Sequence, residues 1–538
     1  MIKSARLSAL VAAMSAVSIA NAACRESTPG PQEPASNSQW WKDAVFYEIF
    51  VRSFADSTTG PLANDGVGDL RGIIERLDYL NDGNPNTTDD LGVTALWLMP
   101  IAQSPSYHGY DVVDYKSVDD EYGTIEDFKE LAAQARKRGM RIIVDTVINH
   151  SSSEHPWFQD AIDRDSPKHD WFVWADTPPT GPGEPNHTVW HDDYLSRNGQ
   201  YFYGFFWHEM PDFNLRNPEA TEAIYDFSRF WLTDMNADGL RLDAIKHLIE
   251  DGVIFENTPE TTEWLNGYNK AMHDAKPDAF IVGEVWADTA TIARFMDGGV
   301  DSAFAFPLAD AIVDSINNAN SKPLRRTIKD MVKTDMFPRF STFIGNHDMD
   351  RVIDRLGSSR ERAAAAATIL LTLPGIPFIY YGEEIGMQGT KPDPDIRTPM
   401  QWTPDPETAG FTAGKPWRKP NADTPTVNVE TENADPDSLA NLYRNLIRLR
   451  TENPTLAGGS FDLIFGGHDA VVAWVRESAN QRLLIIVNLS SSPVADYRIS
   501  GTRGMPVREL LHGRDLTNRV GYPILELDPY TGYVIELR

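Results

Sequence analysis

Cysteine is nearly absent from this 538-residue chain, in which Cys24 is the only one. A lone cysteine excludes an intramolecular disulfide as a source of stability. Basic residues are also scarce, because 49 lysines and arginines stand against 78 aspartates and glutamates and leave a net charge of −29. This excess of negative charge argues against nucleic acid and against an anionic membrane surface as binding partners.

Long apolar runs are missing beyond the first residues, since no later stretch reaches the roughly 18 apolar residues of a membrane-spanning helix. Residues 1–23 combine two basic residues, a mostly apolar run and Ala20-Asn21-Ala22, which is typical of a secretory signal peptide. Residues 24–39 are rich in Ser, Pro and Glu, as in a flexible linker. The sequence therefore predicts export to the periplasm or the extracellular space. A lipid on Cys24 that anchors the protein to the outer membrane, and plain export without a lipid, both remain open.

Hydrophobic residues are plentiful, at 41% of the chain, and aromatic residues make up 10%. This content suffices for a large core and excludes disorder for most of the chain. The length indicates more than one structural unit. We expect the protein to be a monomer.

Apolar strands alternate with amphipathic helices, such as 124–138 and 217–234, from residue 40 onward. This rhythm is typical of a parallel sheet with helices between its strands. We predict eight strands, at residues 44–51, 93–99, 141–147, 239–243, 280–284, 302–306, 342–345 and 376–380. The fold class is therefore α/β, and residues 40–150 and 211–455 are predicted to form a (β/α)8 TIM barrel.

Two segments depart from this rhythm. Residues 151–210 are rich in Trp, Tyr, Phe and Pro without a helical period, which indicates an inserted domain after the third strand. From residue 456 to 538 the chain changes to short alternating runs, which are typical of a separate C-terminal β-sandwich domain with antiparallel strands. The runs predicted to be strands are 470–475, 483–488, 497–499 and 533–537.

Three predicted barrel strands end at carboxyl groups, namely Asp243, Glu284 and Asp348. Arg241 lies on the same face as Asp243, and its charge favours the ionised state that a nucleophile requires. Taken alone, Arg241 and Asp243 could equally be a structural ion pair at a strand end or part of a catalytic site. Trp286 and its apolar neighbour flank Glu284 and favour a raised pKa. Because strand C-termini of a barrel converge, three such ends predict one catalytic site.

A carboxylate nucleophile beside a protonated acid is the arrangement of retaining glycoside hydrolases. Asp348 could then stabilise the positive charge that develops on the sugar ring and bind its hydroxyl groups. His150 and His347 also lie at strand ends beside acids, where they could donate hydrogen bonds to the same ring. A lone histidine is more often structural, but these positions favour a functional role.

The loop from Asp56 to Asp69 has aspartates spaced around glycines. Such a loop can wrap a hard cation with carboxylates and a backbone carbonyl as ligands. A Gly/Asp turn without a metal is the alternative.

Four segments in chain order resemble the signature segments of the α-amylase family of glycoside hydrolases. The resemblance runs from about Trp40 to the C-terminus, and the segments are Asp145–His150, Gly239–His247, Gly283–Trp286 and Asn346–Asp348. It implies that Asp243 is the nucleophile, Glu284 the acid and base, and Asp348 the stabiliser of the transition state. It also implies a set of residues around the bound sugar: Tyr110, Asp111, His150, Arg241, His347 and Arg351.

The same resemblance implies a structural calcium ion. The candidate ligands are Asp56, Asp65, Val67, Asp69 and Asn149, of which Asn149 would tie the barrel to the insertion. The loop departs from the family pattern, because proline and alanine stand where acidic or amide ligands are expected.

The family resemblance implies the catalytic residues more clearly than it implies the preferred substrate. Met210–Asn214 resembles neopullulanase-like and intermediate members, and Lys246-His247 resembles amylases that act on longer maltooligosaccharides. Arg397–Trp402 also occurs in oligo-1,6-glucosidase-like members. We predict a retaining hydrolase of α-1,4-glucosidic bonds in starch or maltooligosaccharides. The alternatives are an α-glucosidase, an oligo-1,6-glucosidase, a neopullulanase or a transglycosylase and, from another class, a non-catalytic sugar-binding protein on this fold.

Overall fold

A computed structural model describes residues 39–180, 188–192, 198–499, 502–517 and 524–538. The predicted signal peptide, Cys24 and nearly all of the predicted linker lie outside the described residues. Within the described part of the chain, every helix is too short or too polar to cross a bilayer.

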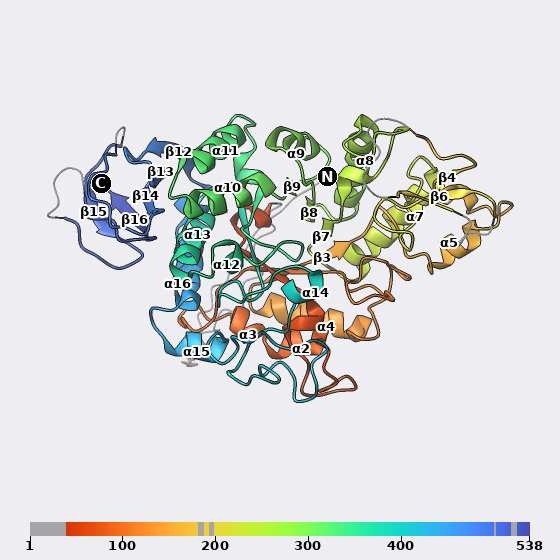
Figure 1. Ribbon diagram of the computed structural model, residues 1–538, viewed down its shortest axis with the longest axis horizontal. Helices are drawn as coiled ribbons and strands as arrows, with labels where there is room; N and C mark the ends of the chain where they lie inside the picture. The colour runs from red at the N-terminus through yellow and green to blue at the C-terminus, as the bar shows by residue number, and fades with distance from the viewer. Residues whose placement is uncertain (1–38, 181–187, 193–197, 500–501, 518–523) are drawn as a thin grey trace, which may run out of the picture. The chain divides into compact units, whose positions relative to one another are not determined.

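Eight parallel strands form the predicted barrel (Figure 1). The strands are β1 (Phe46–Ile49), β2 (Ala95–Leu98), β3 (Arg141–Thr146), β7 (Gly239–Leu242), β8 (Phe280–Gly283), β9 (Ser302–Ala303), β10 (Ser341–Thr342) and β11 (Ile376–Tyr380). Their order is β10-β11-β1-β2-β3-β7-β8-β9, and a parallel bridge between Phe304 and Ser341 joins the two ends. The predicted TIM barrel is therefore confirmed.

Aromatic rings fill the interior of the barrel. Phe46 of β1 stacks on Phe378 of β11 at 4.3 Å between ring centroids. Trp41, in the short 3-10 helix η1 (Trp40–Asp43), stacks on Phe280 at 5.0 Å. Because Phe280 begins β8, this contact anchors the start of the described chain at the N-terminal end of a barrel strand.

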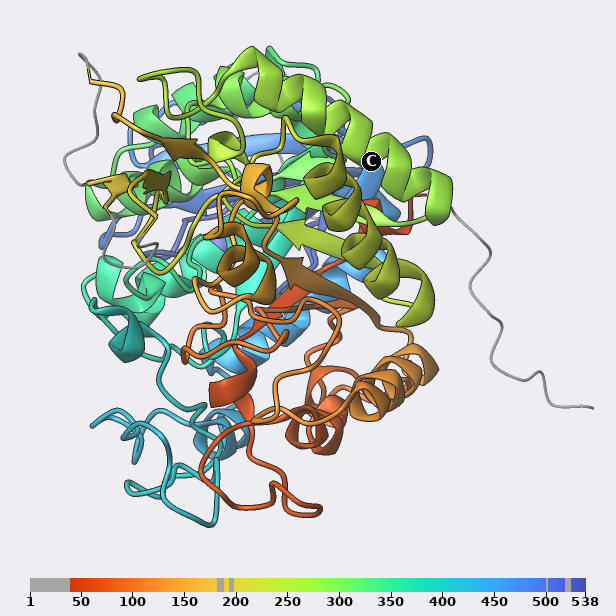
Figure 2. The ribbon, with the colours of Figure 1, turned by 90° about the vertical axis from the view of Figure 1, so that its right-hand side faces the viewer.

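Helices surround the strands, and α8 lies on the outside of β7 and β8 (Figure 2). The longer helices are α4 (Ile125–Lys137), α7 (Pro218–Arg229), α8 (Pro259–Ala275), α9 (Thr289–Met296), α10 (Phe306–Asn317), α11 (Lys322–Val332), α13 (Arg360–Thr372) and α16 (Leu439–Glu452). The shorter ones are α1 (Val51–Phe54), α2 (Leu70–Glu75), α3 (Leu77–Leu80), α12 (Val352–Arg355), α14 (Asp393–Ile396), α15 (Val429–Ala434) and α17 (Pro454–Gly458). Thr124 and Asp127 form a capping box at α4, which satisfies backbone N–H groups of the first turn.

Two helices differ from the periodicity of the sequence. The helical pattern of residues 70–80 breaks at Arg76, whose φ of −110° and ψ of 5° separate α2 from α3. The Arg76 guanidinium lies 4.5 Å from the ring centroid of Trp402, so a tertiary contact accompanies the break. The pattern of residues 217–234 ends as α7 at Arg229 and continues as a π-helical turn over Phe230–Asp234.

The inserted segment has its own small antiparallel sheet in the order β4-β6-β5. Its elements are α5 (Pro156–Ala161), β4 (Trp174–Ala175), β5 (Trp190–His191) and β6 (Tyr201–Tyr203). Its two ends meet in a narrow neck, where an antiparallel bridge pairs His150 with Asp212. In the same neck the Asn149 side-chain amide donates to the Asp212 carboxylate at 3.0 Å.

The C-terminal region forms a five-stranded antiparallel sheet in the order β12-β13-β14-β16-β15. The strands are β12 (Ser460–Phe465), β13 (Val471–Glu477), β14 (Arg482–Asn488), β15 (Pro506–Glu509) and β16 (Gly532–Leu537). One face of the sheet lies against α13, and Tyr497 and Leu527 are in the cluster that covers the other. The prediction of a strand at residues 497–499 is wrong. Its residues alternate between buried and exposed as in a strand, but they join no ladder, and the Tyr497 hydroxyl donates to the Leu525 carbonyl instead.

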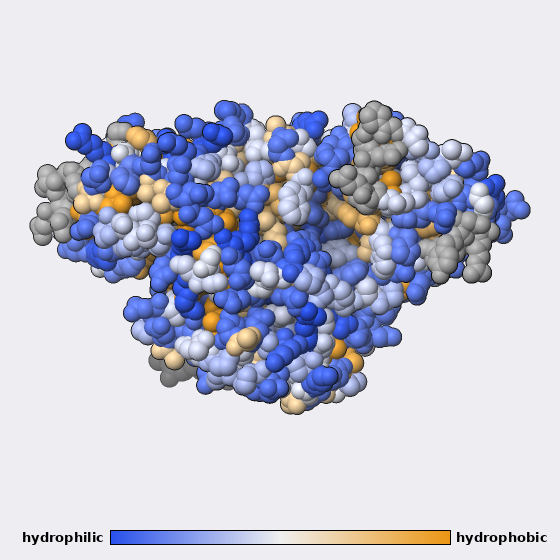
Figure 3. Space-filling view, in the orientation of Figure 1, coloured by the Kyte–Doolittle hydropathy of each residue, from blue (hydrophilic) through white to orange (hydrophobic). Residues whose placement is uncertain are grey.

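Most of the surface in the view of Figure 3 is hydrophilic, with separate small apolar patches. This agrees with the large negative charge of the sequence.

Candidate active site

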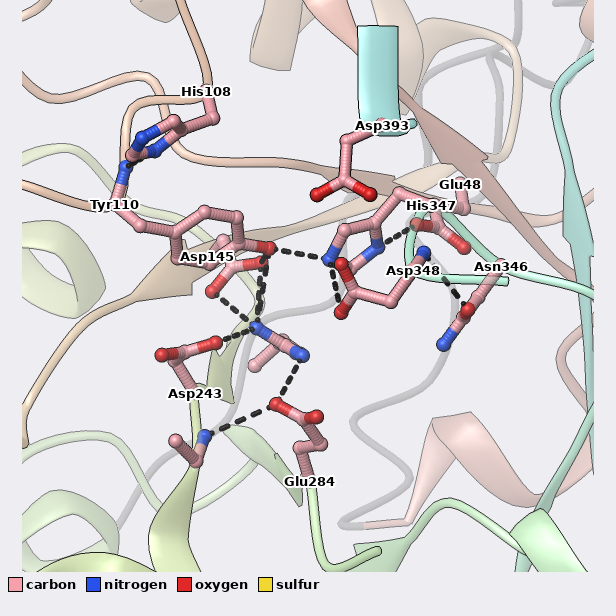
Figure 4. Close-up of polar contacts among 12 residues, drawn as sticks. Glu48, His108, Tyr110, Asp145, Asp243, Glu284, Asn346, His347, Asp348 and Asp393 are labelled. Carbon is pink, nitrogen blue, oxygen red and sulfur yellow. Dashed lines mark hydrogen bonds and ion pairs between the residues drawn. The ribbon is translucent and has the colours of Figure 1, made fainter. Parts of the chain in front are cut away.

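Arg241 organises a cluster of carboxylates at the C-terminal ends of neighbouring barrel strands (Figure 4). Its Nη1 binds Asp243 Oδ1 at 2.7 Å and Asp145 Oδ1 at 3.0 Å, and its Nη2 binds Glu284 Oε2 at 2.7 Å. The side chain is only 1% exposed. Because a guanidinium is rigid and planar, it holds Asp243 and Glu284 side by side.

Each of the two acids keeps one oxygen away from Arg241. The Asp243 oxygen that is not bonded to Arg241 points away from the guanidinium in Figure 4. Glu284 Oε2 accepts from Arg241 and from the backbone N–H of Ala244 at 3.1 Å, so Oε1 is the oxygen that can carry a proton. The side chains of Asp243, Glu284 and Asp348 are 12%, 15% and 30% exposed, so all three reach solvent.

The two neighbouring acids have different affinities for a proton. Burial raises the pKa of Asp243 to about 6, although Arg241 opposes the shift. Burial also raises the pKa of Glu284 to about 7, again against Arg241 and with a further rise from the charge of Asp243. Between these values Asp243 is mostly ionised while Glu284 is mostly protonated. The sequence had predicted that Arg241 dominates at Asp243, whereas burial is the larger effect.

Asp348 is a fixed negative charge. Its Oδ2 lies 3.2 Å from His347 Nε2, and its Oδ1 lies 2.9 Å from Arg397 Nη2. Burial raises its pKa, but His347 and Arg397 outweigh this effect and hold the pKa well below the usual range. His347 Nδ1 in turn lies 2.5 Å from Glu48 Oε1. Burial lowers the pKa of His347, but Asp348 and Glu48 raise it to about 9, so the imidazole is protonated at neutral pH.

Tyr110 lies between the two halves of this network. Its hydroxyl is 2.7 Å from His347 Nε2 and donates to Asp145 Oδ2 at 3.2 Å. Its ring stacks on the imidazole of His347 with an interplanar angle of 16°. The contacts therefore unite β1, β3, β7, β8 and the segment after β10 in one site.

Comparison with known proteins identifies the family. The family model "Alpha amylase, catalytic domain" matches residues 48–459. Alpha-amylase 3 of Dictyoglomus thermophilum is 39% identical over 463 residues, which cover 84% of this chain and 86% of that protein. The chain belongs to the α-amylase family of glycoside hydrolases.

Other similar proteins of the α-amylase family carry different names. Glucan 1,6-alpha-glucosidase of Streptococcus pneumoniae is 32% identical over 559 residues, which cover 93% of this chain and 99% of that protein. The crystal structure of an α-amylase from H. orenii matches with a TM-score of 0.81 and 38% identity, covering 92% of this chain and 100% of that one. The protein is therefore an α-amylase-family glycoside hydrolase, and its relatives include both α-amylases and a glucan 1,6-alpha-glucosidase by name.

Three residues of the site were not among the residues predicted for it. They are Glu48, Asp145 and Arg397, which bind His347, Arg241 and Asp348. Asp145 lies near the end of the strand predicted at 141–147 and could have been found as a fourth acid at a strand end. Glu48 lies within an apolar run, and only the barrel topology reveals that it faces inward. Arg397 reaches the site because the loop after β11 returns across the barrel mouth.

The contact of Arg351 with the sugar stays a prediction, because its Nη2 has no hydrogen-bond partner among the described residues while its other groups bind the protein. The side chain is buried, its Nε donates to the Ile396 carbonyl and its Nη1 donates to the Tyr381 carbonyl. Its guanidinium also lies 4.5 Å from the ring centroid of Tyr380. These contacts fix the loop after β11, and Arg397 is the arginine that reaches Asp348.

Asp111 and His150 differ in how well they fit sugar binding. The buried Asp111 carboxylate accepts from the hydroxyl groups of Ser104, at 2.8 Å, and Ser106, so its bonds in the structure support the loop itself. Within the part of the chain that the structure describes, the buried His150 has no hydrogen-bond partner at Nε2. Burial lowers the pKa of His150 to about 3, so it is neutral and Nε2 is open to a substrate hydroxyl.

Lys246 and His247 lie beside the carboxylate cluster and do not bind its acids. Lys246 Nζ binds Glu256 at 2.6 Å and the Trp286 carbonyl at 3.1 Å. His247 is buried and stacks on Phe205 at 3.8 Å between ring centroids.

The predicted calcium ligands do not form one donor set. Asp56 accepts from the backbone N–H groups of Asn64 and Gly66, and Asp69 accepts from Gly72 N at the start of α2. Asp65 is exposed and accepts from Val67 N, and Asn149 binds Asp212 in the neck. Among the described residues, no group of three or more His, Cys, Asp or Glu side chains is arranged to hold a metal ion. The residues present therefore do not fit the calcium ion that the family resemblance implies.

Proposed function

We propose that this enzyme hydrolyses α-1,4-glucosidic bonds in starch and maltooligosaccharides with retention of configuration at the anomeric carbon. The observation that carries the proposal is the pair of acids on one guanidinium. Asp243 gives up its proton more readily than Glu284, so one acid is a carboxylate while its neighbour is protonated. These are the two states that the first step of a retaining hydrolase requires.

In the first step the free oxygen of Asp243 attacks the anomeric carbon while the bond to the leaving sugar breaks. Glu284 transfers its proton to the departing glycosidic oxygen, and the product is a glycosyl ester on Asp243. Arg241 remains bonded to both side chains and offsets the negative charge that appears on Glu284.

In the second step the Glu284 carboxylate takes a proton from water as the water oxygen attacks the same anomeric carbon. The ester bond to Asp243 breaks, which restores the carboxylate and releases the sugar. Asp348 keeps its charge through both steps, because His347 and Arg397 hold its pKa low. Its fixed negative charge suits the stabilisation of the oxocarbenium-like transition state.

The test is the set of products from maltoheptaose and from pullulan, with the anomeric configuration followed by NMR. We expect shorter maltooligosaccharides from maltoheptaose, with α-anomers formed first. Glucose released alone from the start would instead indicate an α-glucosidase, and products longer than maltoheptaose would indicate a transglycosylase. Panose from pullulan would indicate neopullulanase, and cleavage of isomaltose with intact maltoheptaose would indicate an oligo-1,6-glucosidase.

The variant Asp243→Asn tests the nucleophile directly. The amide cannot act as the nucleophile, so we expect a folded protein whose kcat falls at least about a thousandfold. Circular dichroism checks the fold. A folded variant with wild-type activity would exclude Asp243 as the nucleophile.

A further inference from the structure

The inserted segment carries a groove with aromatic walls. Its volume is about 850 Å³, and its lining comes from β5, β6 and the segment that follows β6. Of the eight large hydrophobic side chains that are exposed in the described residues, three line this groove, namely Tyr201, Phe206 and Trp207. Exposed aromatic rings gathered in one concavity indicate a binding surface, because a stable monomer gains nothing from leaving them in water.

Two aromatic residues of the groove contact histidines that lie beside the catalytic cluster. The ring of Phe206 lies 5.4 Å from the imidazole of His150, which follows β3. The ring of Phe205 stacks on His247, four residues after Asp243. One wall of the groove is therefore built on residues that leave the same strand ends as the carboxylate cluster.

The groove also adjoins the segment that joins the nucleophile to the acid. Phe205, in its lining, stacks on His247, and Lys246 beside His247 donates to the carbonyl of Trp286, two residues after Glu284. A glucan bound at the carboxylate cluster can therefore extend toward the groove.

The chemistry of the lining suits glucose units. The faces of a pyranose ring are C–H groups that stack on aromatic rings, while its hydroxyl groups need polar partners at the rim. His208 and Thr188 supply polar groups beside the rings of Phe206 and Trp207. An anionic lipid is disfavoured by the net charge of −29.

We propose that Trp207, with Phe206 and Tyr201, stacks on glucose units of an α-glucan that extend beyond the cleaved bond and so sets the chain length that the enzyme prefers. This inference rests on the proposed function. A long substrate reaches the groove, whereas a substrate of three glucose units does not fill it.

The test compares kcat/KM for maltoheptaose with kcat/KM for maltotriose. In Trp207→Ala we expect this ratio to fall about tenfold, mainly through KM for the longer substrate, since one stacking contact is lost. Trp207→Phe keeps an aromatic face and should retain most of the ratio. Phe465→Ala removes an equally exposed ring from β12, outside the groove, and should leave the ratio unchanged. An unchanged ratio in Trp207→Ala, or an equal fall for both substrates, would overturn the proposal.

A binding measurement separates this inference from the proposed function. In the Glu284→Gln background, which removes the acid, isothermal titration with maltoheptaose should show about tenfold weaker binding when Trp207→Ala is added. Equal binding with and without Trp207→Ala would reject the groove. If the wild-type enzyme cleaves no α-1,4-glucan, the proposed function fails, whatever the titration shows.

Discussion

At the residue scale, Arg241 opposes the effect of burial on the proton affinity of both acids. Its positive charge lowers the pKa of Asp243 and of Glu284, which burial alone would raise further. Activity needs Asp243 ionised and Glu284 protonated, so we expect kcat/KM of the wild type to be highest between about pH 6 and 7.

In Arg241→Gln both pKa values should rise, because the opposing charge is gone. We expect both limbs of the pH profile to move to higher pH and kcat to fall about a hundredfold. The measurement is kcat/KM from pH 4 to 9, with the fold checked by circular dichroism. Limbs that stay in place would show that Arg241 does not tune the acids.

The contact between Glu48 and His347 leads to a prediction about how the stability of the fold depends on pH. The folded-state pKa of His347, about 9, lies above the ordinary value of 6.5, so protonation stabilises the fold. This contribution is complete below pH 6.5, is worth about 3 kcal/mol, and is lost as the pH rises through about 9. We expect Tm to fall between pH 7 and 9.5 in the wild type.

Glu48→Gln removes one of the two charges that raise the pKa of His347. The loss of stability between pH 6.5 and 9 should then be smaller and complete at a lower pH, with a lower Tm at pH 7. Thermal melts of both proteins across this range are the measurement. A Glu48→Gln curve that parallels the wild type at every pH would contradict the assignment.

The sequence predicts the reacting residues better than it predicts their partners. Asp243, Glu284 and Asp348 are visible because each ends an apolar run, and the barrel brings such ends together. Glu48 and Arg397 are not visible in this way. Glu48 sits inside an apolar run, and Arg397 depends on a long loop whose path follows from tertiary contacts such as those of Arg351 with the carbonyls of Ile396 and Tyr381.

At the scale of elements, α16 holds the end of α13 through one buried cation. Arg450 of α16 donates to the carbonyls of Leu371, Leu373 and Gly375 at 2.6–2.9 Å. These carbonyls lie at and beyond the last turn of α13, where a helix leaves its acceptors unsatisfied and favours positive charge. Trp474 of β13 donates to the neighbouring Thr372 carbonyl, so the C-terminal sheet is joined to the same helix end.

Arg450→Met should therefore lower the free energy of unfolding by about 2–4 kcal/mol, because buried carbonyls lose their partners. Arg448→Met is the control on the same helix, since Arg448 is partly exposed and binds the carbonyl of Thr87. We expect about 1 kcal/mol or less for the control. Urea denaturation measures both, and equal losses would refute the role of Arg450.

The loop from Asp56 to Asp69 gives a prediction about metal removal. Backbone N–H groups already satisfy the Asp56 carboxylate, so neither EDTA nor added calcium should change Tm by more than about 1 °C. Asp56→Ala leaves two N–H groups without their acceptor and should cost about 2 kcal/mol. Asp65→Ala, at an exposed turn, should cost about 0.5 kcal/mol or less. A large fall of Tm in EDTA would restore calcium to this loop.

The periodicity of the sequence predicted the barrel strands but not every break in the elements around them. The helical pattern of residues 70–80 continues through Arg76, yet the contact of Arg76 with Trp402 accompanies a break there. The alternation at 497–499 is real, but a strand also needs a partner in the ladder. Both differences arise from contacts between residues that are distant in sequence.

At the scale of the whole molecule, residues 1–23 are predicted to direct the enzyme to export. We expect the mature protein to lack residues 1–23 and to begin at Cys24 if a lipid is attached there. Mass spectrometry of the protein from its native membrane and culture fractions checks this. A mature chain that retains residue 1 would contradict export, and an unmodified Cys24 would exclude the lipid anchor.

The neck of the insertion has a consequence for how such enzymes diversify. Asn149 and Asp212 join the two ends of the inserted segment, and Phe205 and Phe206 pack on His247 and His150, while the barrel strands under the cluster around Arg241 pair without the insertion. Replacement of residues 151–210 by the corresponding segment of a relative should thus exchange the wall that a bound glucan meets beside the acids and leave the pairing of the barrel strands intact. New substrate preferences can then arise by the exchange of one inserted segment.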